Sequence, residues 1–160
     1  MKLKSVGMQN SVEQGKELPN DGRGATKSAG DFTYVDDYLA ELAVDLSSVE
    51  GIIRFVNLML WKGVAGGARE IKLTHWGSEF KISFLLGNYL KSVDAPSVRY
   101  APAIVARIKC LANLGIEKHC AYEQNGIMKL TIAGQPVDIF VTCRKLVGGE
   151  SIVLQIKRNS

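Results

Sequence analysis

Residues 70–86, EIKLTHWGSEFKISFLL, decide the fold class of this chain. They predict two short strands, 70–74 and Glu79–Leu86, joined by a turn at His75-Trp76-Gly77-Ser78. The second strand alternates inward apolar side chains with outward polar ones, in the order Phe80, Lys81, Ile82, Ser83, Phe84. A period of two is typical of a strand with one buried face. The stretch therefore predicts a hairpin in a sheet that is covered on one side.

A helix is predicted just before this hairpin. Ser47-Ser48-Val49-Glu50 has the pattern of a capping box, in which the Ser47 hydroxyl accepts from the backbone N–H of Glu50 and the Glu50 side chain reaches back. Gly66-Gly67 is expected to end the helix. The apolar residues between them follow helical spacing: Val49, Ile52, Ile53, Val56, Leu60 and Val64.

Two further helices are expected from the same kind of pattern. The stronger one spans 98–114, with Pro102 in its first turn, where proline is tolerated, and Gly115 at its end. A shorter one lies within 31–46 and is expected to dock on the main body of the domain.

The C-terminal part predicts three strands, at 127–132, 136–143 and 151–157, with Ala133-Gly134-Gln135 as a tight hairpin link. The order is two helices, two strands, a helix and three strands. This order predicts an α/β (α+β) sandwich in which helices pack on one face of a mostly antiparallel sheet. PAS-like and profilin-like folds share this layout.

Composition limits the domain organisation and the partners. Residues 1–30 have too few large apolar side chains to offset their ordering entropy, so we expect a flexible tail there and a single domain at 31–157. No stretch has the length and apolarity of a membrane span or a signal peptide, which indicates a cytoplasmic protein without direct membrane insertion. The net charge of +4 is scattered, so no nucleic-acid partner is expected.

Phosphate-binding and redox motifs are missing from the sequence. Residues 63–69 contain glycines but no Lys-Ser or Lys-Thr pair, and Lys27-Ser28 follows Thr26 where a phosphate-binding loop needs glycine. The three cysteines form no CxxC pair, so we expect reduced thiols at Cys110, Cys120 and Cys143.

The histidines and acidic pairs do not indicate a catalytic or metal site. His75 and His119 lack metal-ligand spacing, and the adjacent His119-Cys120 would point apart on a strand, unlike a Cys–His nucleophile pair. Asp36-Asp37 is typical of a solvated helix start. We expect no catalytic residue, no metal and no cofactor, and hence no enzyme activity from these residues.

Several fragments between residues 50 and 156 together resemble one known module. They are residues 53–58 (IRFVNL), 67–73 (GAREIKL), 107–109 (RIK), 124–126 (QNG), 137–142 (VDIFVT) and 149–154 (GESIVL). The module is the PAS-like domain that precedes the motor domain in type II secretion and type IV pilus assembly ATPases. The resemblance implies a PAS-like fold. It also implies that arginines of this domain supply positive charge near the phosphates of a nucleotide held by a motor domain.

The chain departs from that family at the positions expected to carry this charge. Where the family has arginine, this sequence has Lys81, Ser83, Leu85, Phe140, Ser151 and Gln155, and where it has histidine, this sequence has Lys72. Ser, Leu, Phe and Gln cannot replace the bidentate, permanently charged contacts of a guanidinium with phosphate. We call these seven the substituted positions. The pattern predicts a retained fold with a lost nucleotide role.

The first functional interpretation is therefore a non-catalytic protein-interaction or regulatory module without nucleotide hydrolysis. Its partner would be a component of a secretion or pilus machine, or another copy of the same chain. One alternative is a PAS-like sensor whose apolar pocket is lined by Phe84, Leu85 and Leu86. Another is a subunit that completes a nucleotide site in trans, with these candidate cations: Lys81, Arg107, Lys109 and Arg144. A piece of a longer motor is also considered, although the arginine losses argue against a working motor as its parent.

Overall fold

The computed structural model describes residues 46–116 and 122–159. Several predictions fall outside these ranges and stay predictions: the tail at 1–30, the docking helix within 31–46, and the loop with His119 and Cys120.

Helix α5 (Val49–Ala65) begins one residue later than the capping box predicts. The N-cap is Ser48, whose hydroxyl accepts from the backbone N–H of Gly51 at 2.9 Å, so Ser47 as the cap is wrong. Ser48 supplies the same chemistry three residues before its donor. At the other end Gly67 has φ +83 and the N–H of Ala68 bonds the carbonyl of Gly63, which confirms the glycine stop as a Schellman motif.

Six strands form one sheet in the order β3-β2-β1-β6-β5-β4. The strands are β1 (Glu70–Trp76), β2 (Glu79–Leu86), β3 (Tyr89–Val93), β4 (Glu123–Ile132), β5 (Gln135–Leu146) and β6 (Gly149–Arg158). Every pairing is antiparallel. The two halves of the sheet join where β1, the first strand, pairs with β6, the last.

The strand predictions were correct in number for the C-terminal half, with three strands. For the first half they were incomplete, because β3 was missed, and the turn predicted at His75-Trp76-Gly77-Ser78 is wrong in its first two residues, which belong to β1. Each late strand extends beyond its predicted range, and Ala133-Gly134 with φ +54 and +77 makes the hairpin turn between β4 and β5. β3 was missed because its residues, YLKSV, show no clean alternation and only Val93 is buried.

Helix α6 (Ala101–Leu111) follows a short 3-10 turn at Val98–Tyr100. Pro102 lies in its first turn, as predicted. The predicted end at Gly115 is wrong, because the chain turns at Asn113, whose φ is +61. The N–H of Leu114 then bonds the carbonyl of Lys109 at 2.8 Å. Asparagine takes this left-handed position in place of the glycine expected there.

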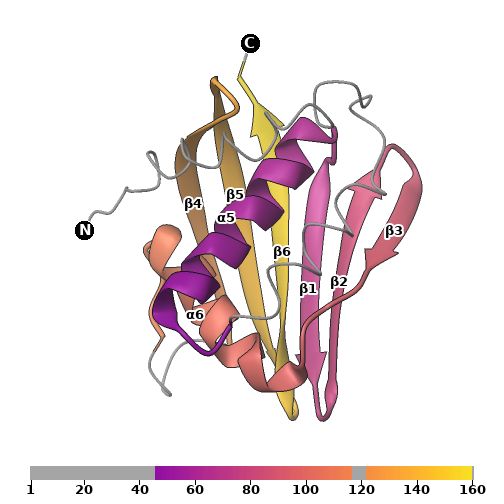
Figure 1. The fold of residues 1–160 in the computed structure, drawn as a ribbon, viewed down its shortest axis with the longest axis vertical. Coiled ribbons are helices and arrows are strands. Elements are labelled where there is room, and N and C mark those ends of the chain that lie inside the picture. Colours follow the sequence, from indigo (N-terminus) through magenta and orange to yellow (C-terminus); the bar gives the residue numbers. More distant parts are fainter. Residues whose placement is uncertain (1–45, 117–121, 160) are drawn as a thin grey trace.

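Both described helices cover the same face of the sheet, with α5 running obliquely across the strands and α6 beside it (Figure 1). The core lies between the two layers, and its largest side chains without solvent contact include Phe55, Met59, Leu73, Phe84, Ile104 and Met128. This confirms the predicted architecture of helices packed on an antiparallel sheet. None of the helices within the described residues has the length and apolar character that crossing a bilayer would require.

Candidate functional site

The face of the sheet turned away from α5 and α6 is the candidate site, here called the open face. Side chains alternate along each strand, and residues paired in register share a face. Ile71 and Leu73 of β1 are buried under the helices, so Glu70, Lys72 and their register partners belong to the open face.

All seven substituted positions lie on the open face. Lys72 pairs with Ser83 on one side and with Val153 on the other, and the remaining positions follow by the same register. They are Lys81, Ser83 and Leu85 on β2, Phe140 on β5, and Ser151 and Gln155 on β6. Residues scattered over 84 positions of sequence therefore change one continuous surface, and the buried face keeps its apolar character.

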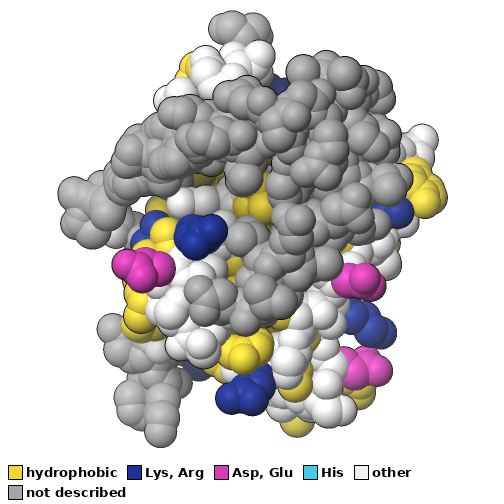
Figure 2. All heavy atoms as spheres, in the orientation of Figure 1, with side chains coloured by type: hydrophobic (Ala, Val, Ile, Leu, Met, Phe, Trp, Pro, Cys, Tyr) yellow, Lys and Arg dark blue, Asp and Glu magenta, His cyan; other side chains and the backbone are white. Residues whose placement is uncertain are grey.

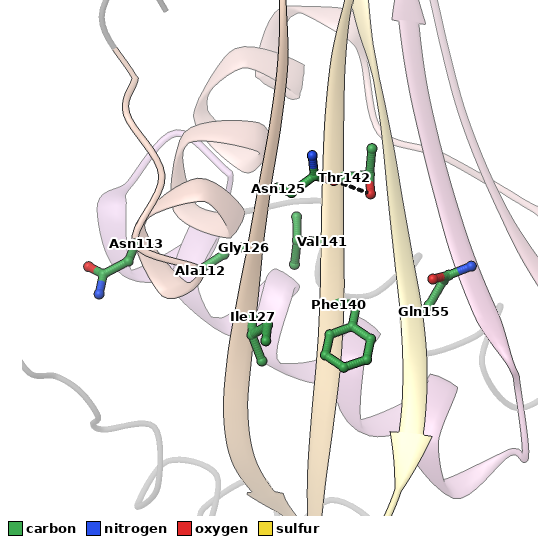
Figure 3. A pocket seen from close by; sticks show the side chains of 9 residues that line it. All are labelled: Ala112, Asn113, Asn125, Gly126, Ile127, Phe140, Val141, Thr142 and Gln155. Atoms are coloured by element: carbon green, nitrogen blue, oxygen red, sulfur yellow. Dashed lines mark hydrogen bonds between the residues drawn. The ribbon is translucent and has the colours of Figure 1, made fainter. Parts of the chain in front are cut away.

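Part of the open face borders an open groove of about 680 Å³ at the β4 side of the sheet. Phe140 and Ile127 lie side by side on β5 and β4, and the Thr142 hydroxyl bonds the Asn125 side chain at 2.9 Å (Figure 3). Gly126 lets α6 approach the strand here, because a Cβ at Gly126 would lie 2.5 Å from the carbonyl oxygen of Ala112. The described residues that line the groove combine apolar and amide groups, and none of them is charged.

Two of the candidate nucleotide-binding cations, Lys81 and Arg144, lie on the open face. Each is already paired within the chain, Lys81 with Glu79 at 3.4 Å and Arg144 with Glu123. Both pairs are exposed, so they contribute little stability but reduce the positive charge available to an anion.

The other two candidate cations lie away from the open face. Lys109 is buried between α6 and the sheet, with its ammonium 2.5 Å from the Glu150 carboxylate. Arg107 is half-buried on α6, and burial lowers the pKa of its guanidinium. Its Nε is buried and has no hydrogen-bond partner among residues 46–116 and 122–159. The fold thus does not bring Lys81, Arg107, Lys109 and Arg144 together into one site.

A cluster of polar side chains lies on the helix-covered face of the sheet, around the Lys109–Glu150 pair. His75 is the register partner of Glu150, and its pKa is lowered, mainly by burial, although Glu150 opposes the shift. Burial raises the pKa of the nearby Cys143 thiol to about 11, so this thiol is protonated at neutral pH and is no nucleophile. Within residues 46–116 and 122–159 no group of three or more metal-ligating side chains could hold an ion.

The pocket expected for a sensor is not built as predicted. Phe84 is fully buried in the core, whereas Leu85 lies on the open face, because neighbours on a strand point to opposite sides. The residues around the groove come instead from α6, β4, β5 and β6.

Sequence reasoning missed two apolar residues of the open face, Leu90 and Ile127, which are 55% and 46% exposed. Leu90 belongs to the missed strand β3. Ile127 stands in the outward phase of β4, where Asn125 and Lys129 are polar, and this break in alternation was the available signal. Figure 2 shows the opposite, helix-covered side, where the described cationic and acidic side chains are interspersed without a patch of one sign.

Residues 45–160 match the family described as type II/IV secretion system protein. The chain is 29% identical over 127 residues to type II secretion system protein E of Xanthomonas campestris, which covers 79% of this chain and 22% of that protein. It is 30% identical over 105 residues to type II secretion system ATPase E of Vibrio cholerae, covering 66% and 21%. It is 28% identical over 110 residues to type IV pilus assembly ATPase PilB of Pseudomonas aeruginosa, covering 68% and 19%. The chain spans about a fifth of the length of these curated relatives.

Proposed function

This chain belongs to the type II/IV secretion system protein family, and we propose that it is a non-catalytic interaction or regulatory module whose open face binds a protein. The partner would be a component of a secretion or pilus machine, met in the cytoplasm. No nucleotide hydrolysis is assigned to the chain.

One observation carries this proposal: the seven substituted positions share the open face. Guanidinium groups there would suit phosphate, whereas Leu85, Phe140, Ser83 and Gln155 offer apolar area and neutral hydrogen-bonding groups. Protein interfaces have such a composition at their centre, where charged residues are depleted and aromatic residues enriched. A fold kept intact beneath a surface that has lost its arginines fits reuse for binding protein.

The test is co-purification from the native host, followed by mass spectrometry. The informative variant is Leu85→Arg/Phe140→Arg, which restores two arginines of the family pattern on a face where side chains can reach solvent. We expect the wild type to recover secretion or pilus components and this variant to lose them. Val49→Arg, an exposed apolar-to-arginine change at the start of α5, is the matched control and should behave as wild type. The proposal would be overturned if the wild type recovered no machine component, or if Leu85→Arg/Phe140→Arg recovered as much as the wild type.

Small-ligand sensing is the second candidate, and the groove beside Phe140 and Asn125 favours it. A thermal-shift screen with metabolites and nucleotides tests this candidate, and a flat response would remove it. A nucleotide site completed in trans is tested by titration calorimetry with ATP and magnesium. Absence of heat with folded protein would exclude binding by this chain alone and leave the interaction role.

A further inference from the structure

The open face has two charged residues without a partner in the described chain, Glu70 and Lys72 of β1. The other charged side chains there have partners: Lys81 with Glu79, Arg144 with Glu123, Lys129 with Asp138, and Lys157 with the ring of Phe140. Glu70 and Lys72 stand two residues apart on the same strand, at the middle of the sheet. Among the described residues, the open face therefore has one unpaired carboxylate and one unpaired ammonium group next to each other on β1.

These two residues belong to two neighbouring rows that cross all six strands. The row through Glu70 is formed mainly by large side chains and is here called the large row: Leu90, Leu85, Glu70, Gln155, Phe140 and Ile127. The row through Lys72 is formed mainly by smaller ones and is here called the small row: Ser92, Ser83, Lys72, Val153, Thr142 and Asn125. The open face thus has a row of mainly larger side chains beside a row of mainly smaller ones, each with one charged residue near its middle that is unpaired among the described residues.

A surface of this kind is complementary to itself. In a two-fold arrangement of two sheets face to face, with the axis running between the rows, the large row of one copy lies over the small row of the other. Leu85 then meets Ser83, Phe140 meets Thr142, and Glu70 meets Lys72, each contact occurring twice. Large side chains opposite small ones allow the two faces to interdigitate at about 10 Å separation.

We propose that the open face binds a second copy of this chain in such a two-fold dimer, with Glu70 of each copy paired to Lys72 of the other. This inference rests on the proposed function and names the partner of the same face. It also accounts for the substituted positions, because Leu85, Phe140 and Gln155 lie in the large row and Ser83 in the small row. Arginines at both Leu85 and Ser83, which face each other across the axis, would set like charges together, and arginines at Phe140 and Gln155 would place charges opposite the uncharged Thr142 and Val153.

The size of the face predicts a weak dimer. Six strands about 4.8 Å apart and seven residues of about 3.4 Å each give a footprint of roughly 570 Å² per copy. The total, roughly 1,100 Å², lies just below the usual range of stable complexes, so we expect a dissociation constant weaker than about 1 µM. The dimer should therefore be visible only as a concentration-dependent equilibrium.

Charge exchange gives the sharpest test, by sedimentation velocity of the full chain at concentrations from about 10 µM to about 1 mM. Glu70→Lys and Lys72→Glu should each weaken self-association by about tenfold or more, because each sets like charges together twice. The double variant Glu70→Lys/Lys72→Glu should restore it. An equimolar mixture of the two single variants should associate at least as well as the wild type, because every cross-copy pair is then attractive. Arg54→Glu, on exposed helix surface, is the charge-matched control and should not change association.

The outcomes distinguish a second copy of this chain from a different protein as the partner of the open face. If the wild type stays monomeric throughout, or the mixed single variants do not associate while folded, the second copy is overturned. The proposed function then stands or falls separately, on whether Leu85→Arg/Phe140→Arg still loses a machine component from the native host. Loss of that component with a monomeric wild type assigns the open face to a different protein.

Discussion

The ammonium of Lys109 lies 2.5 Å from the carboxylate of Glu150, and this buried ion pair fastens the last turn of α6 to the start of β6. The two side chains are only 8% and 15% exposed, so removal of one leaves the other charged without a partner in a low-dielectric site.

We predict that Lys109→Met lowers the free energy of unfolding by about 3 kcal/mol, measured by urea denaturation. Lys109→Met/Glu150→Leu should cost clearly less, because no orphan charge remains. Lys129→Met breaks the exposed pair with Asp138 and should cost less than about 1 kcal/mol. Equal losses for the two single variants would show that burial of the Lys109 pair has no special effect.

Stability should fall as pH drops below about 6.5 because of His75. Its pKa is lowered in the folded state, chiefly by burial, so the unfolded chain takes up the proton first and acid favours unfolding. The contribution of neutral His75 to stability is fully present above the pKa that this side chain has in the unfolded chain. Urea midpoints at about pH 7.5 and pH 5.5 should differ more for the wild type than for His75→Gln. An identical pH dependence for the two proteins would exclude His75 as the cause.

Gly126→Ala should destabilise the domain by about 1–3 kcal/mol. The new Cβ would lie 2.5 Å from the carbonyl oxygen of Ala112 and 3.2 Å from its Cβ, and backbone cannot move aside as a flexible side chain can. Thr131→Ala, an exposed change on the same strand, is the control and should be nearly neutral. A thermal melt that is unchanged in Gly126→Ala would mean that α6 can shift away from β4 at little cost.

Thiol alkylation should distinguish Cys110 from Cys143. Cys110 is exposed, whereas Cys143 is buried and its pKa is raised to about 11, so only about one thiol in a thousand is thiolate at about pH 8. In a Cys120→Ser background we expect one rapid modification, which Cys110→Ser removes, and a slow second one that requires unfolding. Mass spectrometry over time measures both. Fast modification of Cys143 in native protein would contradict its buried placement.

The sequence allowed α5 and the hairpin of β1 and β2 to be predicted because their apolar periods are long and unbroken. Local signals failed where two neighbouring residues competed for one role, as Ser47 and Ser48 did for the N-cap. They also failed where an unusual residue took a glycine position, as Asn113 did at the end of α6. β3 could not be predicted, because an edge strand with one buried residue shows almost no alternation of apolar and polar side chains.

The open face could be predicted only in part. The spacing of Lys81 and Ser83 placed them on one side of β2 from sequence alone, whereas Leu85 was grouped with Phe84 and Leu86 in a predicted pocket. Their assembly with Phe140 and Gln155 required the pairing of β1 with β6, and long-range register leaves no trace in a single sequence. The Lys109–Glu150 pair was missed for the same reason, and Lys109 was considered as a candidate nucleotide-binding cation.

The pairing of β1 with β6 also determines when this domain can fold. The two strands at the centre of the sheet are its first and its last. The two halves of the sheet can therefore join only after the segment with Gln155 has been made and pairs with Glu70. Contacts between such distant segments require closure of a long loop and make folding slow. During synthesis, β1 can pair with β2, but its other edge stays open until residues 149–158 have left the ribosome, and wrong strand pairing is possible at that edge until then.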